Sequence, residues 1–376
     1  MLDLMQITTP VLLLDETRAR ANLARMAARA ERQGIRFRPH FKTHQSAAMG
    51  DWFRAVGVRA ITVSSVRMAR YFADAGWDDI TIAFPVNVRE LPAIAELAAR
   101  VRLGLLVDSE AAVTALGMAC SQPVDVWLEV DTGYQRSGLP VEHVDACVAV
   151  LRAARAQAHL RVQGLLTHTG QSYAAQGEAA LTALHAHTLG ALQSLRAALA
   201  TAGFPGLELS IGDTPTCSVV DDLGAVDEMR PGNFVFYDWM QHTIGACSEQ
   251  DIAVAVACPI VAVYPARREL ILYGGAVHLS KEFIRPADGA PDYGHAAALD
   301  ESGWGPAWEG VYLRALSQEH GILHAANTRS FDAHLAACNV GDLVAVLPIH
   351  SCLTADLLKT YTTLGGERIA MMETAP

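Results

Sequence analysis

The chain has 376 residues, of which 51% are hydrophobic, and its formal net charge is −11. This length accommodates a large domain with a smaller one. The acidic charge and the absence of a lysine-rich run argue against nucleic acid and anionic membranes as partners. Seven scattered cysteines without a CxxC pair indicate a reducing compartment rather than a disulfide framework, so we expect a cytoplasmic protein.

The N-terminal part of the chain alternates between helical and strand patterns. Asp15 can cap a first helix, which Gly34 can end, and the strand 35–41 follows. Further strand candidates follow, most of them short apolar runs and most separated by amphipathic helices, as in a buried parallel sheet. They are residues 59–65, 78–85, 101–108, 124–131, 160–168, 207–213 and 225–232.

Eight βα units within residues 15–245 predict an α/β fold, a (β/α)8 TIM barrel. A doubly wound open sheet is the alternative, but no GxGxxG follows the first strand. Strands dominate residues 246–376, which predicts a second, smaller C-terminal β domain. The strand at 8–14 has no place in the barrel, so we expect it to join the β domain. The apolar run 252–264 is too short to span a bilayer and is predicted to be a buried strand.

Polar residues gather at the C-terminal ends of the predicted barrel strands, where barrel enzymes place their chemistry. Lys42, which follows the first strand, is one of three lysines in a chain with 26 arginines. Unlike arginine, lysine can lose its proton and form a Schiff base with a carbonyl. The alternative is an ordinary surface cation.

A second feature is the segment "IGDTPT" (211–216), which is either a phosphate cradle or a plain turn. Gly212 frees the backbone and Thr214 offers a hydroxyl, whereas Asp213 counts against a phosphate unless its side chain points away. A Schiff-base lysine and a phosphate cradle together suggest pyridoxal 5'-phosphate, with Arg136 as a candidate partner of the ring nitrogen. His168 either stacks on the ring or is a core histidine.

His350 and Cys352 form a candidate metal site. Side chains two residues apart point the same way on a strand. An imidazole and a thiolate suit Zn2+, and two protein ligands leave positions open for substrate. A buried free cysteine beside a histidine is the alternative.

Several motifs together resemble the D-serine dehydratase and D-threonine aldolase family of fold-type III, alanine racemase-like pyridoxal phosphate enzymes. The resemblance runs from about residue 9 to about residue 359 and rests on "RPHFKTH", "RSG", "THTGQSY", "DTPT", "RPGNFVFYD" and "HSC". It implies that Lys42 carries the cofactor and that His350 and Cys352 hold Zn2+ or another divalent metal such as Mn2+. It also implies a cofactor site made of Lys42, Arg136, His168, Tyr173, Gly212, Asp213, Thr214 and Tyr237.

The resemblance implies a lyase that removes water from D-serine-like D-3-hydroxy amino acids and yields a 2-oxo acid and ammonia. Cys352 matches the zinc-dependent dehydratase branch, since the aldolase branch tends to have an aspartate there. The alternatives are a D-threonine aldolase, which gives glycine and an aldehyde, a D-threo-3-hydroxyaspartate dehydratase, and a cofactor-binding barrel without catalysis.

Three further expectations concern the surroundings of the site. A second substrate carboxylate would need a nearby cation, for which Arg67 is the candidate. The stretch with His278 and Lys281 receives no role. The resemblance also implies a homodimer that takes a small-molecule D-amino acid as substrate.

Overall fold

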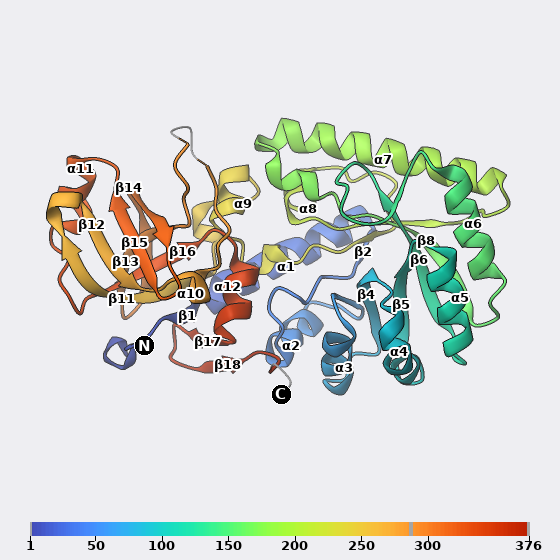
Figure 1. Cartoon of the computed structure of the whole chain (residues 1–376), viewed down its shortest axis with the longest axis horizontal. Helices are drawn as coiled ribbons and strands as arrows, with labels where there is room; N and C mark the ends of the chain where they lie inside the picture. Colours follow the sequence, from blue (N-terminus) through green and yellow to red (C-terminus); the bar gives the residue numbers. More distant parts are fainter. Residues whose placement is uncertain (1, 286–288, 374–376) are drawn as a thin grey trace.

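The computed structural model describes residues 2–285 and 289–373. A barrel of strands and helices occupies one end of the long axis and a β domain occupies the other, with α12 between them (Figure 1). The barrel strands are β2 (Arg36–Phe37), β3 (Ile61–Val63), β4 (Asp79–Pro85), β5 (Arg102–Val107), β6 (Val124–Asp131), β8 (Leu160–Leu166), β9 (Glu208–Ile211) and β10 (Glu228–Met229).

These strands form one parallel sheet in the order β2-β10-β9-β8-β6-β5-β4-β3. The two ends of the sheet meet, because the Phe41 amide donates to the Thr62 carbonyl (2.8 Å) and the Thr62 amide donates to the Pro39 carbonyl (2.9 Å). The predicted (β/α)8 barrel with its smaller β domain is therefore confirmed. The short strand β7 (Leu139–Pro140) pairs with β6 outside this order.

The first helix of the barrel begins and ends where the sequence indicates. In α1 (Glu16–Gln33), the Asp15 carboxylate accepts the Arg18 amide, and Gly34 ends the helix in the left-handed conformation (φ 65°). Leu23 and Met26 lie on its buried face. The other helices of this region are α2 (Ala47–Ala55), α3 (Val66–Asp74), α4 (Leu91–Ala98), α5 (Glu110–Ala119), α6 (Val144–Arg155), α7 (Gly177–Thr201), α8 (Thr214–Val219) and α9 (Trp239–Ile244).

The β domain is built on a second sheet in the order β12-β15-β14-β13-β16-β11-β1-β17-β18, in which β12 also pairs with β11. Its strands are β1 (Val11–Leu14), β11 (Val254–Tyr264), β12 (Glu269–Tyr273), β13 (Gly294–Asp300), β14 (Gly303–Leu316), β15 (His320–Ala325), β16 (Leu343–Pro348), β17 (Thr360–Thr363) and β18 (Arg368–Ala370). Its helices are α10 (Ala276–Leu279), α11 (Thr328–Ser330) and α12 (Ser351–Leu358).

The N-terminal strand β1 pairs antiparallel with β11 and parallel with β17. The chain thus enters the β domain before it forms the barrel, as predicted, and the run 252–264 forms the strand β11. The exact domain boundary at 245/246 stays a prediction. No helix in the described part of the chain is long and apolar enough to cross a membrane, and all seven cysteines are free.

Candidate active site

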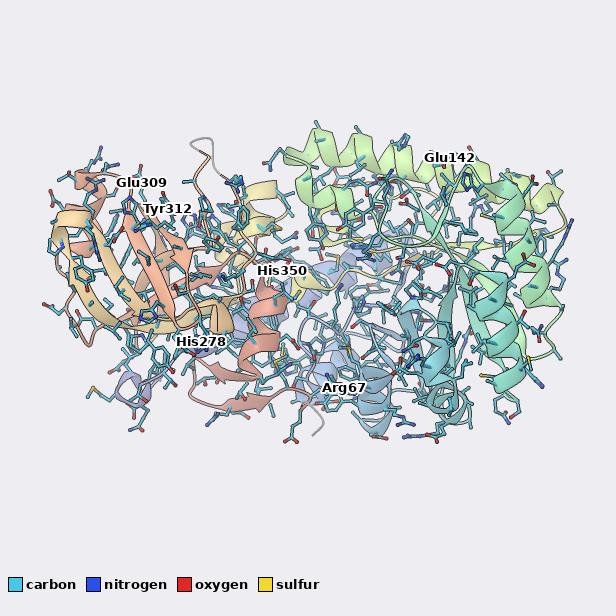
Figure 2. The ribbon with its side chains drawn as sticks, in the orientation of Figure 1. Arg67, Glu142, His278, Glu309, Tyr312 and His350 are labelled. Atoms are coloured by element: carbon cyan, nitrogen blue, oxygen red, sulfur yellow. The ribbon has the colours of Figure 1, made fainter. Side chains whose placement is uncertain are left out.

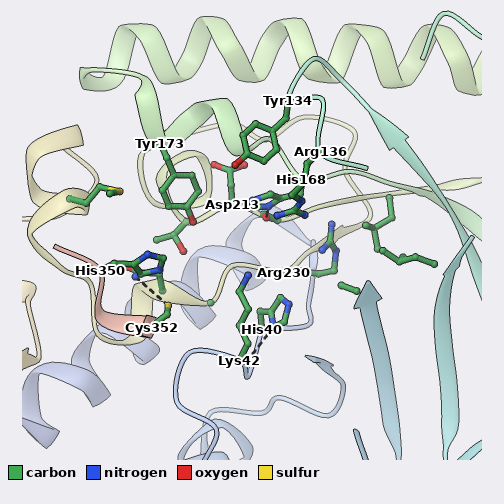
Figure 3. Close-up of a pocket in the computed structure, with 18 of the residues that line it drawn as sticks. His40, Lys42, Tyr134, Arg136, His168, Tyr173, Asp213, Arg230, His350 and Cys352 are labelled. Carbon is green, nitrogen blue, oxygen red and sulfur yellow. Dashed lines mark hydrogen bonds between the residues drawn. The ribbon is translucent and has the colours of Figure 1, made fainter. Parts of the chain in front are cut away.

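A cavity of about 390 Å³ lies at the C-terminal ends of the barrel strands, facing the β domain. This volume falls in the range of small-molecule sites. The cavity is lined by all the predicted site residues except Tyr237: Lys42, Arg136, His168, Tyr173, Gly212, Asp213, Thr214, His350 and Cys352. Figure 3 labels all of these except Gly212 and Thr214. Tyr237 lies outside this lining, with its hydroxyl 3.1 Å from that of Ser218 in α8.

Lys42 projects into the cavity from the turn after β2 (Figure 3). Water can reach the side chain through the cavity, but protein surrounds it closely. This enclosure lowers the pKa of the Lys42 ammonium; Cys352 opposes the shift and Arg136 adds to it. No carboxylate in residues 2–285 and 289–373 forms an ion pair with the amine. The environment therefore favours a neutral, nucleophilic amine.

Two histidines near Lys42 are held neutral. The Nδ1 atom of His40 accepts the backbone amide of Lys42 (3.3 Å), and burial keeps the pKa of His40 well below its ordinary value. His168 donates from Nδ1 to the Gly212 carbonyl (2.6 Å). Burial, with Lys42 and Arg136 nearby, lowers the pKa of His168 to about 3. Because both imidazole rings are neutral, they add no positive charge beside the Lys42 amine.

The loop after β9 has some features that favour anion binding and one that opposes it. A Cβ at Gly212 would lie 2.9 Å from the Cβ of Arg230, so a larger residue does not fit. The Thr214 hydroxyl is buried and has no protein partner within the described residues, which leaves it available to a bound group. Asp213 caps α8 by accepting the Thr216 amide (2.8 Å), so a phosphate cannot use that amide. Burial raises the pKa of Asp213, which weakens its repulsion of an anion.

Two arginines line the cavity at different depths. Arg230 is 3% exposed, and it donates to the Ser210 hydroxyl and the Thr167 carbonyl, both at 2.7 Å. Arg136 is exposed, and its guanidinium lies 5.6 Å from the ring centre of Tyr134. The cavity therefore holds one fixed cation on its floor and one adaptable cation near its mouth.

The metal candidates occupy a helix start, not a strand. The strand β16 ends at Pro348; His350 is the N-cap of α12, and Cys352 lies in its first turn. The expected strand placement was therefore wrong, because the chain turns into a helix directly after β16. Both side chains nevertheless line the cavity, since the first turn of the helix directs them to the same opening.

The His350–Cys352 pair has the support that a metal site needs. The Nδ1 atom of His350 lies 2.5 Å from Glu282, which leaves Nε2 for a metal, as in carboxylate–histidine–metal arrangements. Burial raises the pKa of the Cys352 thiol, but His350 outweighs this effect and the net pKa lies below its ordinary value. The described residues contain no cluster of three or more metal-ligating side chains.

A buried network fixes the start of α12. The Asn233 amide donates to Asp238 (2.6 Å) and to the Ser351 hydroxyl (3.0 Å). Asp238 also accepts the Ser351 backbone amide (3.0 Å). This network holds Cys352 in place through the residue that precedes it.

The sequence missed several residues of the site and misplaced one. The cavity lining also includes His40, Glu129, Tyr134, Arg230, Asn233 and Glu282. Arg67, expected near a second substrate carboxylate, lies on α3 outside the cavity and donates to the Glu373 carbonyl (2.9 Å; Figure 2). His278 lies 3.8 Å from Glu319 and, like Lys281, does not line the cavity. The segment that contains His278 and Lys281 contributes the next residue, Glu282, to the cavity lining.

Comparisons with known proteins agree with this geometry. Residues 14–238 match the family "Alanine racemase, N-terminal domain", and residues 253–364 match the "Putative serine dehydratase domain". D-threo-3-hydroxyaspartate dehydratase from Delftia sp. (strain HT23) is 32% identical over 368 residues, which cover 97% of this chain and 96% of the relative. D-serine dehydratase from Dictyostelium discoideum is 26% identical over 97% of this chain and 95% of the relative.

Solved structures of related enzymes have the same fold as this chain. The Delftia dehydratase structure aligns with a TM-score of 0.88 at 29% identity and covers 99% of both chains. A cysteine-to-alanine variant of a D-threo-3-hydroxyaspartate dehydratase, solved in the metal-free form, aligns with a TM-score of 0.89 at 30% identity. The chain therefore belongs to the alanine racemase-like, fold-type III family with a D-serine dehydratase domain, a family of pyridoxal phosphate-dependent dehydratases and aldolases that act on D-3-hydroxy amino acids.

Proposed function

We propose that the protein is a pyridoxal phosphate- and metal-dependent lyase that removes water from a D-3-hydroxy amino acid and yields a 2-oxo acid and ammonia. One observation carries this proposal: Lys42 and the pair His350 and Cys352 line a single cavity. Racemisation would instead require a second base on the opposite face of the substrate and no metal. The dehydratase names of two relatives that cover most of the chain point the same way.

The residues present fit the cofactor. When bound, pyridoxal phosphate supplies an electron sink for the negative charge that develops at Cα. Lys42 would hold it covalently, and the unpartnered Thr214 hydroxyl beside Gly212 would receive its phosphate. Arg136 stays the predicted partner of the ring nitrogen. The buried Arg230 is a second candidate, and if it has this role, Arg136 is left for the substrate carboxylate.

The chain's own groups cover the proton and leaving-group chemistry. The Lys42 amine, whose pKa is lowered by its surroundings, is the group that takes the α-proton. Cys352 and the Nε2 atom of His350 would hold the metal, with Glu282 fixing the imidazole. A divalent metal bound there supplies a Lewis acid for the departing hydroxyl. The thiolate ligand favours Zn2+ over harder ions such as Mn2+.

D-serine, D-threonine and D-threo-3-hydroxyaspartate are the substrates to test first, because all three have a hydroxyl at Cβ. The enamine released by elimination hydrolyses in water to the 2-oxo acid and ammonia. A homodimer and a cytoplasmic location stay predictions.

The test is to incubate the purified protein with each substrate and to identify the products by chromatography, with L-serine as the stereochemical control. Equal amounts of ammonia and 2-oxo acid from a D-substrate support elimination. Glycine with an aldehyde would assign the protein to the aldolase branch and would refute the interpretation of Cys352 as a dehydratase feature.

A further inference from the structure

A buried carboxylate lines the cavity without a role in the proposed reaction. Glu129, on β6, is 5% exposed and lines the same cavity as Lys42. Its Oε1 atom accepts the Ser137 hydroxyl (2.7 Å). Its Oε2 atom is buried and has no partner within the described ranges. A buried acceptor of this kind is costly unless a bound group satisfies it.

The loop after β6 closes tightly over Glu129. The Asp131 carboxylate accepts the Tyr134 amide (2.8 Å) at the start of the loop. At its end, Gly138 has a φ of 93°, and a Cβ there would lie 3.0 Å from the carbonyl carbon of Glu129. The hydrogen bond from the Ser137 hydroxyl to Glu129 also holds the loop against β6. The carboxylate is thus fixed beside the loop that carries Arg136.

Glu129 lies in the field of both cavity arginines. Burial raises the pKa of the Glu129 carboxyl, while the Ser137 hydrogen bond and the charges of Arg136 and Arg230 oppose this shift. Neither arginine forms a direct ion pair with Glu129 in the described structure. They are the only arginines that line the cavity among residues 2–285 and 289–373, and Arg67 lies outside. These two guanidinium groups are therefore available to a substrate carboxylate, and the charge of Glu129 opposes their attraction.

We propose that Glu129 is a specificity-determining residue whose negative charge limits the acceptance of a second substrate carboxylate. The inference rests on the proposed function and deepens it. D-serine brings one carboxylate, whereas 3-hydroxyaspartate brings two, and a charged Glu129, which is itself buried, repels each of them. Removal of the charge should therefore favour dicarboxylate substrates over monocarboxylate ones.

The test uses the cofactor-loaded protein and the variant Glu129→Gln, whose amide oxygen can still accept the Ser137 hydroxyl. The ratio of kcat/KM for D-threo-3-hydroxyaspartate to that for D-serine should rise by about tenfold, mainly through KM. Glu142→Gln is the matched control, because Glu142 is exposed and outside the cavity (Figure 2). Ser137→Ala removes the hydrogen bond and keeps the charge, so it should leave the ratio unchanged.

A binding measurement separates this inference from the proposed function. Calorimetry with succinate and butyrate, a dicarboxylate and a monocarboxylate of equal length, should show that Glu129→Gln strengthens succinate binding relative to butyrate. This shift would support the inference even if no substrate were turned over. Unchanged ratios in both assays, or the same shift in Ser137→Ala, would overturn it. If the glutamine variant does not fold, Glu129→Met removes the charge for the same measurements.

Discussion

Replacement of Glu228 with glutamine should destabilise the barrel by about 3 kcal/mol. Glu228, on β10, is fully buried and accepts hydrogen bonds from Arg38 (2.7 Å), Arg36 (2.8 Å) and Ser210 (2.8 Å). Breaking a buried ion pair typically costs ~3–5 kcal/mol, because the remaining charge stays buried without compensation. We expect the lower end of that range, since Arg38 keeps its ion pair with Asp79 (2.5 Å).

The assay is urea unfolding followed by circular dichroism, which gives the change in the free energy of unfolding. Glu208→Gln is the matched control, because Glu208 pairs with Arg36 at the exposed end of the same network. Its loss should cost about 1 kcal/mol or less. If Glu228→Gln also cost less than about 1 kcal/mol, the reasoning about the buried network would be refuted.

The stabilities of the wild-type protein and of Glu228→Gln should also respond differently to acid. Burial raises the pKa of Glu228, but Arg38 and Arg36 outweigh this effect and hold the pKa below its ordinary value of 4.5. The stability that this carboxylate contributes is therefore present above about pH 4.5 and is lost as the pH falls through its folded-state pKa. The difference in unfolding free energy between wild type and Glu228→Gln should narrow in acid.

Four further substitutions test the site. Elemental analysis should show that Cys352→Ala has lost its bound metal. This variant should also lose about 100-fold or more of the elimination activity and should keep the cofactor absorbance. Lys42→Ala should lose the absorbance of covalently held cofactor together with turnover. Gly212→Ala should weaken cofactor binding by about tenfold in an absorbance titration, because the new methyl group meets the Arg230 side chain. Arg67→Ala should leave KM for D-threo-3-hydroxyaspartate within about twofold of wild type in steady-state assays.

The helices and strands that local sequence patterns determine could be predicted from the sequence. Most of the barrel strands are short apolar runs in the sequence, and Asp15 and Gly34 are residue types that favour the start and the end of a helix such as α1. The early strand β1 was predicted to leave the barrel because it precedes the first helix of the βα repeat. It pairs with β11, more than 230 residues later.

The parts of the site that depend on distant contacts were not predictable. His350 and Cys352 were placed on a strand, because two residues at i and i+2 do not reveal where β16 ends and α12 begins. Glu282, 68 residues before His350, has no sequence pattern that links it to that imidazole. Glu129 looks like an ordinary strand residue until the fold brings it to the cavity with Arg230.

The most direct test of the account is metal dependence of product formation in the wild-type protein. Ammonia and 2-oxo acid would be measured from a D-3-hydroxy amino acid before EDTA treatment, after it, and after Zn2+ is added back, with cofactor absorbance recorded throughout. We expect EDTA to abolish both products and Zn2+ to restore them, while the cofactor stays bound. Unchanged 2-oxo acid formation by protein shown to be metal-free would contradict the proposed role of His350 and Cys352.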